Sequence, residues 1–338
     1  MDDIIAIAMR GGLLDMEYRG NIAVTDTKGR ILFSLGDPRR VAFARSSAKP
    51  MQAIAAIESG AAEHYGLNQN EIAMIAASHS GQPHHLEIIR AMLEKAGLDE
   101  SFLGCGSSYP LYLPEADRMK KQDIPPAPIY HNCSGKHTGM LLTAKFLGED
   151  LSDYMLPDHP VQRRITALIG ELCDYDPEKI VLGCDGCGVP VHALPLFKFA
   201  QGIARMASPE SIGGKRGEIA AQGTAAITAR PDIIAGTGRI CTQLMDAFGD
   251  RLFAKAGADG YYAVGLIGKG IGIALKMSDG YAPVVPYAIF ETLIQLGVIT
   301  RDEAQAVELY SDHNIYNTRR EIVGHTEAAF NLEKERTI

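Results

Sequence analysis

Short apolar runs separated by turn residues open the chain. These runs stay apolar for only a few residues or alternate with polar positions, which favours strands over helices. A glycine pair and a Thr-Lys-Gly-Arg segment lie between them and are typical of tight turns. The start of the chain therefore predicts an antiparallel meander. Its strands are expected at 4–9, 13–20, 21–26 and 31–36, with turns at 11–12 and 27–30.

The middle of the chain carries apolar residues at helical spacing. From 48 to 59 they recur near the 3.6-residue period of a helix, with Ser46 or Ser47 as its cap and Gly60 as its end. Comparable patterns, each bounded by turn residues, follow along the middle of the sequence. Further helices are expected at 85–95, 114–121, 135–147, 160–173, 195–206 and 214–229, and a short strand at 180–182.

Strand patterns return near the end of the chain. A sheet whose first and last strands come from opposite chain ends, with a helical insertion between them, accounts for this order. The predicted fold class is α+β (αβα), an antiparallel sheet flanked by helices, in one unit over 1–338. The late strands are expected at 239–247, 251–257, 261–267 and 271–280, followed by helices at 288–296 and 302–309.

Charge and composition narrow the classes of function. Lys and Arg total 33 against 41 Asp and Glu, and the resulting net charge of -8 argues against a nucleic-acid partner. No segment approaches the roughly 20 apolar residues of a membrane span. Acidic residues stand at the N-terminus, where a secretory signal has basic ones. We therefore expect a cytoplasmic protein whose six cysteines are thiols, metal ligands or core residues rather than disulfides.

An amine and a hydroxyl stand three residues apart at the opening of the first predicted helix. Ser46 and Lys49 fall on one face there, so the lysine can take the proton of the serine. The same spacing also occurs by chance, with serine as a cap and lysine in solvent. Pro50 further disfavours the helical conformation of Lys49. The spacing alone therefore leaves both interpretations open.

Two further polar groups interrupt the apolar pattern. Ser78 stands in the segment 77–81, Ala-Ser-His-Ser-Gly, as either an active-site hydroxyl or a helix or strand cap. Lys255 lies on a predicted strand next to a glycine, where it either faces a pocket or simply ends the strand. Each residue alone favours the structural interpretation.

Cysteines gather in two segments that also hold other potential metal ligands. Thiolates and imidazoles bind zinc, and Cys-x-x-Cys is half of a structural zinc site. A single Cys-x-x-Cys is also typical of two packed thiols, and a redox pair would need a following helix, which nearby prolines oppose. The candidates are Cys133, Lys136 and His137 in one segment, and Cys184, Asp185, Cys187 and His192 in the other.

Taken in order, these motifs resemble one family, the bacterial L-asparaginases II of rhizobial type, or class 3 asparaginases. Several motifs in the same order are far more specific than any one of them, and they cover nearly the whole chain. The family is distinct from the threonine-dependent asparaginases. The matching segments are 10–12, 36–38, 45–50, 77–81, 132–137, 183–190 and 255–260.

The resemblance implies a fold similar to serine β-lactamases and glutaminases, and hydrolysis of L-asparagine to L-aspartate and ammonia. It implies two Ser-Lys pairs, Ser46 with Lys49 and Ser78 with Lys255. It also implies one zinc ion per chain near the serines. The implied zinc ligands are Cys133, Lys136 and Cys187, with Asp185 near metal and substrate.

The expected reaction is an acyl transfer. Ser46 attacks the carboxamide while Lys49 accepts its proton, and water then hydrolyses the ester with Lys49 or Lys255 as base. Backbone N–H groups at the helix start are expected to stabilise the oxyanion. Arg45 or His137 is expected to bind the α-carboxylate of the asparagine substrate, and Asp185 is expected to bind its α-amino group.

Zinc is expected to organise the pocket and not to generate the nucleophile, and Cys184 is expected to pack against the core. We also expect a homodimer that acts on a small molecule, with no nucleic-acid or membrane partner. Two other functions remain open at this point. One is a glutaminase or another β-lactamase-like serine hydrolase, and the other is a non-enzymatic zinc or thiol module.

Overall fold

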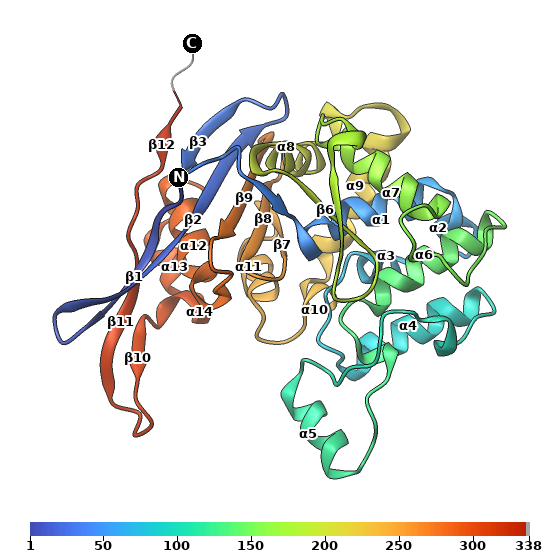
Figure 1. Cartoon of the computed structure of the whole chain (residues 1–338), viewed down its shortest axis with the longest axis horizontal. Coiled ribbons are helices and arrows are strands. Elements are labelled where there is room, and N and C mark those ends of the chain that lie inside the picture. Colours follow the sequence, from blue (N-terminus) through green and yellow to red (C-terminus); the bar gives the residue numbers. More distant parts are fainter. Residues whose placement is uncertain (336–338) are drawn as a thin grey trace.

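One large antiparallel sheet joins the two ends of the chain in the computed structural model, which describes residues 1–335 (Figure 1). Its order is β10-β11-β1-β2-β9-β8-β7, and β3 and β12 extend it beside β2. The strands are β1 (Asp3–Arg10), β2 (Leu13–Asp26), β3 (Ile31–Leu35), β7 (Leu252–Ala256), β8 (Tyr261–Leu266), β9 (Ile271–Met277), β10 (Asn314–Tyr316), β11 (Ile322–Ala328) and β12 (Glu333–Lys334).

Helices cover both faces of this sheet. Successive strand residues point to opposite faces, and on β8 the ring of Tyr261 meets Phe199 of α8 edge to face, whereas Tyr262 points toward α11. α12 packs on the same side as α11, through Phe248 and Phe290. The bounds of these helices are α8 (Leu196–Ala207), α11 (Ile240–Phe248), α12 (Val285–Gln295), α13 (Arg301–Gln305) and α14 (Glu308–Ser311).

A helical part occupies the middle of the chain and lies beside the sheet (Figure 1). A second sheet of three strands, in the order β4-β6-β5, lies between these two parts. Its strands are β4 (Val41–Phe43), β5 (Val181–Cys184) and β6 (Pro190–Pro195). The helices are α1 (Lys49–Glu58), α2 (Ala61–His64), α3 (Gln69–Ile75), α4 (Pro83–Lys95), α5 (Leu113–Lys121), α6 (Ser134–Phe146), α7 (Pro160–Leu172), α9 (Gly214–Ala229) and α10 (Pro231–Ile234).

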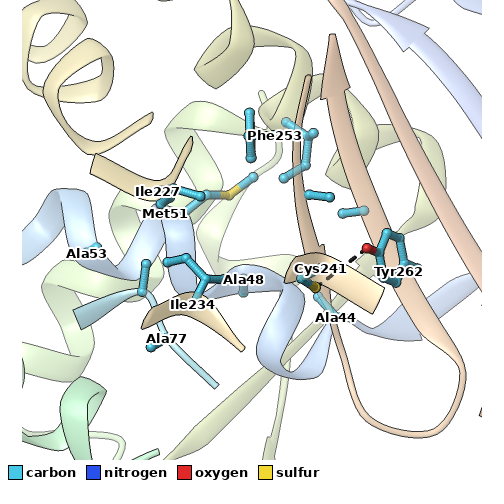
Figure 2. Packing of buried hydrophobic residues seen from close by; sticks show 14 of the residues in the cluster. Ala44, Ala48, Met51, Ala53, Ala77, Ile227, Ile234, Cys241, Phe253 and Tyr262 are labelled. Atoms are coloured by element: carbon cyan, nitrogen blue, oxygen red, sulfur yellow. Dashed lines mark hydrogen bonds between the residues drawn. The ribbon is translucent and has the colours of Figure 1, made fainter. Parts of the chain in front are cut away.

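The core is continuous between the sheet and the helical part. Figure 2 shows apolar side chains of α1, α9 and β7 packed together, with Met51, Ile227 and Phe253 among them. All three are buried. A short 3-10 helix, η1 (Arg45–Ala48), leads from β4 into α1 beside this cluster. The start of α1 is therefore fixed from both parts of the molecule.

The topology confirms the predicted fold class, an antiparallel sheet flanked by helices, with strands from both chain ends. One predicted strand is wrong, because residues 239–247 form α11 and not a strand. Its buried residues recur at a helical period, at 241, 244, 245 and 248. The predicted cap of the first helix is also wrong, since α1 has Ala48 at its N-cap and no side-chain cap bond.

Three strands that the sequence pattern did not indicate complete the sheet. β10 lies at one edge beside β11, β12 pairs with β3, and the residues of all three strands are mostly exposed or half-buried. Such strands lack the continuous apolar run that marks a buried strand. Within residues 1–335, no helix is both long enough and apolar enough to cross a membrane.

Close packing of α8 on β9 gives a test of the fold. A Cβ at Gly272 would overlap the backbone of Ala200, which cannot move without displacing the helix. Overpacking of this kind destabilises a protein, so Gly272→Ala should lower the free energy of unfolding by about 3 kcal/mol. Gly223→Ala on α9 is the control, since its Cβ would lie 3.9 Å from the nearest side chain. Denaturant unfolding that ranks the two variants equally would contradict the packing.

Candidate active site

Two buried lysines share one serine hydroxyl. Lys49 Nζ lies 3.0 Å from Ser78 Oγ, and Lys255 Nζ lies 2.8 Å from the same oxygen. Lys49 also donates to the carbonyls of Ala77 and Asn132, at 2.7 and 3.2 Å, and Lys255 donates to Ala256 O at 2.9 Å. Hydrogen bonding to these oxygens compensates the burial of two amines.

Segments far apart in the sequence bring these three side chains together. Lys49 is the first residue of α1, where a proline at the second position is tolerated because its missing N–H has no partner in the helix. Ser78 follows α3, and its backbone N–H donates to Ile234 O at 2.8 Å. Lys255 lies on the edge strand β7. The meeting of the three is therefore a product of the tertiary fold.

Burial favours the neutral form of both amines. Lys49 and Lys255 are each 1% exposed and Ser78 is 7% exposed. Burial lowers the pKa of Lys255 to about 7, and the charge of Lys49 acts in the same direction. Burial also lowers the pKa of Lys49. Near neutral pH one lysine can therefore accept a proton from the hydroxyl that they share, while the other donates to it.

Ser46 lies on η1, at the half-buried rim of this group. Among residues 1–335, no hydrogen bond joins Ser46 to Lys49, whose amine turns to Ser78 instead. The neighbouring Ser47 donates to Lys255 O at 2.9 Å and is fully buried. The hydroxyl of Ser46 is thus the more accessible of the two.

Arg45 carries a positive charge beside Ser46. Its Nε donates to Asp185 at 2.8 Å, and its guanidinium also pairs with Asp259. Burial acts to lower the pKa of Arg45, but the two carboxylates raise it above its ordinary value. The backbone of Arg45 has φ of 51°, in the left-handed region that non-glycine residues rarely adopt. Backbone strain of this kind is common at functional sites, and here the ion pairs with Asp185 and Asp259 stabilise the strained conformation.

A cluster of two thiols and an amine lies on the other side of Lys49. Lys136 Nζ is 3.1 Å from Cys187 Sγ, and all three groups are buried. A hydrogen bond from Cys187, with the charges of Lys49 and Lys136, holds the pKa of Cys133 well below its ordinary value. The same bond and burial raise the pKa of Cys187. Burial acts to lower the pKa of Lys136, but the sulfurs of Cys133 and Cys187 raise it above its ordinary value.

This cluster suits a soft divalent cation. Zn–S of about 2.3 Å and Zn–N of about 2.0 Å in a tetrahedron place the two donor atoms about 3.6 Å apart. The observed 3.1 Å between Lys136 and Cys187 needs only a small adjustment. Within residues 1–335, no group of three His, Cys, Asp or Glu side chains is placed to hold a metal. The third donor here is a lysine, so the fit rests on Cys133, Cys187 and Lys136 together.

Cys184 is exposed, so the expectation that it packs against the core is wrong. It ends the edge strand β5, and its Sγ meets only the carbonyl of Asp185, at 3.6 Å. Cys187 takes the buried position of the turn instead. Sequence spacing cannot separate these two cysteines, because the turn alone decides which one points inward.

His137 is buried and neutral. Its Nδ1 lies 2.6 Å from the hydroxyl of Tyr154, which accepts a hydrogen bond from Gly104 N. The tyrosine proton therefore points to Nδ1, and the ring proton stays on Nε2. Within residues 1–335, Nε2 has no hydrogen-bond partner. Burial, with the charge of Lys136, lowers the pKa of His137 well below its ordinary value, so Arg45 is the only one of the two expected carboxylate ligands that is charged.

Several functional contacts had no signal in the sequence. The carbonyls of Ala77 and Asn132 that hold Lys49 belong to backbone, which carries no side-chain pattern. Asp259 lies inside the matching segment 255–260, but no residue near it in the sequence marks it as a partner of Arg45. His192 was a further candidate metal ligand, but its Nε2 lies 2.9 Å from Thr166 Oγ1.

One of three comparisons with known proteins identifies the family. The model of the family described as L-asparaginase II matches residues 6–328. No curated protein sequence matches the chain. A solved beta-lactamase from Mycobacterium bovis is 14% identical, with a TM-score of 0.45 over 83% of this chain and 95% of its own. Mglu in its glutamate form is 13% identical, with a TM-score of 0.38 over 84% and 62%. Structural likenesses this weak carry no argument, and the fold class rests on the topology.

Proposed function

The chain belongs to the L-asparaginase II family, and we propose on that premise that it hydrolyses L-asparagine to L-aspartate and ammonia through a serine acyl-enzyme. The observation that carries the mechanism is the pair of buried lysines on Ser78, at 3.0 and 2.8 Å. Membership of the family supports an amidohydrolase that acts on a small molecule. The choice of nucleophile, the roles of the lysines and the metal belong to the proposal.

In the first step, Ser46 Oγ attacks the side-chain carbonyl carbon of asparagine. Neutral Lys49 takes the serine proton as the new C–O bond forms, which requires its amine to turn from Ser78 toward Ser46. The C–N bond of the carboxamide then breaks, and the departing amine takes a proton from the lysines to leave as ammonia. Ser78 supports this because its hydroxyl joins Lys49 to Lys255, so that a proton can pass between them.

In the second step, water attacks the aspartyl ester on Ser46. A neutral lysine of the same pair accepts the water proton, and the ester C–O bond breaks to release aspartate and restore the serine hydroxyl. Backbone N–H groups at η1 are the proposed donors to the oxyanion in both steps. The lysine network therefore returns to its starting protonation after each turnover.

Charged groups beside Ser46 support recognition of an amino acid. We assign the α-carboxylate to Arg45 and the α-amino group to Asp185, whose side chains are 24% and 11% exposed and already pair with each other. The free Nε2–H of His137 is a neutral donor that suits a substrate oxygen. A zwitterionic head group complements such a pair of opposite charges.

We further propose one zinc ion on Cys133, Lys136 and Cys187. A bound zinc would supply a Lewis acid that orders the pocket and attracts substrate oxygen. Lys136 and Cys187 must lose their protons to bind metal, so the affinity should fall on acidification. The carbonyl of Asn132, the residue before Cys133, accepts a hydrogen bond from Lys49, which links the segment of the proposed ligands to the lysines. A homodimer remains part of the proposal.

Ammonia release from asparagine tests the function and the nucleophile together. Ser46→Ala should lower the rate by about a thousandfold or more, because the ester cannot form. It should cost little stability, since Ser46 caps no helix. Ser211→Ala is the matched control: its hydroxyl donates to Ser208 O and to no member of the lysine group, so the variant loses a bond worth about 1 kcal/mol but should keep its activity within a few-fold.

A Ser46→Ala enzyme that retains more than about a tenth of the wild-type rate would exclude Ser46 as the nucleophile. Parallel assays on glutamine address the alternative function. Equal rates on the two amides would favour a glutaminase or a broader serine hydrolase. No ammonia from either amide would leave only the non-enzymatic zinc or thiol module.

The rate should fall on acidification, because the lysine base is active only when neutral. With the pKa of Lys255 at about 7, kcat/KM should drop about tenfold per pH unit below that value and level off above it. Lys49→Met and Lys255→Met should each lose most activity. Lys198→Met is the control, since this lysine pairs with Asp174 on a different face. A profile flat from about pH 5 to about pH 9 would exclude a lysine base in the slow step.

Metal analysis of purified variants tests the ligand set. The wild type should carry about one zinc per chain, and Cys133→Ala and Cys187→Ala should lose it. Cys184→Ala, exposed in the same turn, should retain it. Stripped protein should bind asparagine more weakly in calorimetry. If Cys184→Ala loses zinc and Cys187→Ala keeps it, the ligand assignment is wrong, and equal asparagine binding with and without metal would refute the pocket-ordering role.

A further inference from the structure

A buried thiol that the proposed mechanism does not use lies beside the strand of Lys255. Cys241 is the second residue of α11 and is 1% exposed. Its Sγ accepts the backbone N–H of Ala256 at 3.1 Å and the hydroxyl of Tyr262 at 3.5 Å. Figure 2 shows the sulfur facing Tyr262 at the start of its helix. Both donors belong to the hairpin that carries Lys255.

The position of β7 explains why a side-chain acceptor is needed there. β7 is the last strand of the large sheet and pairs only with β8. An edge strand leaves alternate N–H groups without a strand partner, and a buried one must be satisfied in another way. At Ala256, the residue after Lys255, the thiol of Cys241 provides that acceptor. The carbonyl of Ala256 takes the amine of Lys255 at 2.9 Å. Both polar groups of this one residue therefore control where the lysine points.

We propose that Cys241 is a positioning residue for Lys255: by holding the N–H of Ala256 and the hydroxyl of Tyr262, it fixes the end of β7 so that the lysine amine reaches Ser78. This rests on the proposed function, in which Lys255 is part of the proton path. Cys241 touches neither Ser78 nor Ser46 through a hydrogen bond within residues 1–335. Its effect is therefore exerted through the backbone of β7.

The test compares three variants of the full-length protein. Cys241→Ala leaves the N–H of Ala256 buried without an acceptor, and kcat on asparagine should fall by between about tenfold and a hundredfold. KM should change little, because the substrate contacts assigned to Arg45 and Asp185 remain. Cys241→Ser keeps an acceptor at this position and should recover part of kcat. Cys173→Ala is the control for loss of a fully buried thiol, because its sulfur bonds to Met51 and, within residues 1–335, makes no hydrogen bond to β7.

Amide hydrogen exchange supplies a readout that is independent of catalysis. In Cys241→Ala, the peptide that contains Ala256 should exchange faster than in wild type, while Cys173→Ala should leave it unchanged. If the wild type releases no ammonia from asparagine, the proposed function fails, and the exchange data still decide whether Cys241 holds the strand.

Unchanged exchange at Ala256 in Cys241→Ala would refute the proposal. So would an active wild type whose Cys241→Ala variant keeps its kcat, or an equal loss of kcat in Cys173→Ala. If Cys241→Ala does not fold, Cys241→Ser and Tyr262→Phe take its place. Cys241→Ser keeps an acceptor for both donors and Tyr262→Phe removes only one of the two contacts, so each should lower kcat by a smaller factor.

Discussion

Two amines buried within hydrogen-bond distance of one hydroxyl set the main constraint on this structure. Taking a charged ammonium group out of water is costly, and a second one nearby is more costly still. Two features reduce this cost. Burial shifts the lysines toward their neutral form, and backbone carbonyls accept hydrogen bonds from their amines. The carbonyls at 77, 132 and 256 come from three separate segments. The surroundings of Lys49 and Lys255 are therefore where the helical part and the sheet must fit each other.

Close backbone approach is the result of this fit. The end of β7 must lie against η1, and Gly257 makes that possible, because a Cβ there would come within 2.8 Å of Ala44 O and 3.0 Å of Ser47 Oγ. Ser47 then donates to Lys255 O and joins the two elements. Phe253 of β7 and Met51 of α1 belong to one apolar cluster (Figure 2). The position of Lys255 and the packing of the core thus depend on the same close approach of β7 to η1.

The sequence predicted the first three and the late strands β7, β8 and β9 as well as most helices, because their apolar patterns are local, but it missed the mostly exposed strands β10, β11 and β12. It placed Ser46 and Lys49 in one helical turn, but the amine of Lys49 turns to Ser78, a contact that only tertiary packing decides. It took α11 for a strand, since β-branched and apolar residues at its start suit either structure. It assigned Cys184 to the core because a turn motif does not reveal which cysteine points inward. The sequence therefore predicts the chemistry of neighbouring residues, but it does not predict which residues far apart in the chain pair with each other.

The geometry of η1 explains how one short segment serves several partners. A 3-10 helix has about three residues per turn, so successive side chains leave its axis in different directions. Arg45 turns to carboxylates from the β5–β6 and β7–β8 connections, and Ser47 turns inward to Lys255 O. Ser46 between them stays half-buried at the rim, while Lys49 begins α1 and reaches Ser78. A regular α-helix from residue 45 would place the side chains of Arg45 and Lys49 on one face. The change from η1 to α1 therefore separates a charge suited to substrate recognition from the amine suited to proton transfer, with the accessible hydroxyl between them.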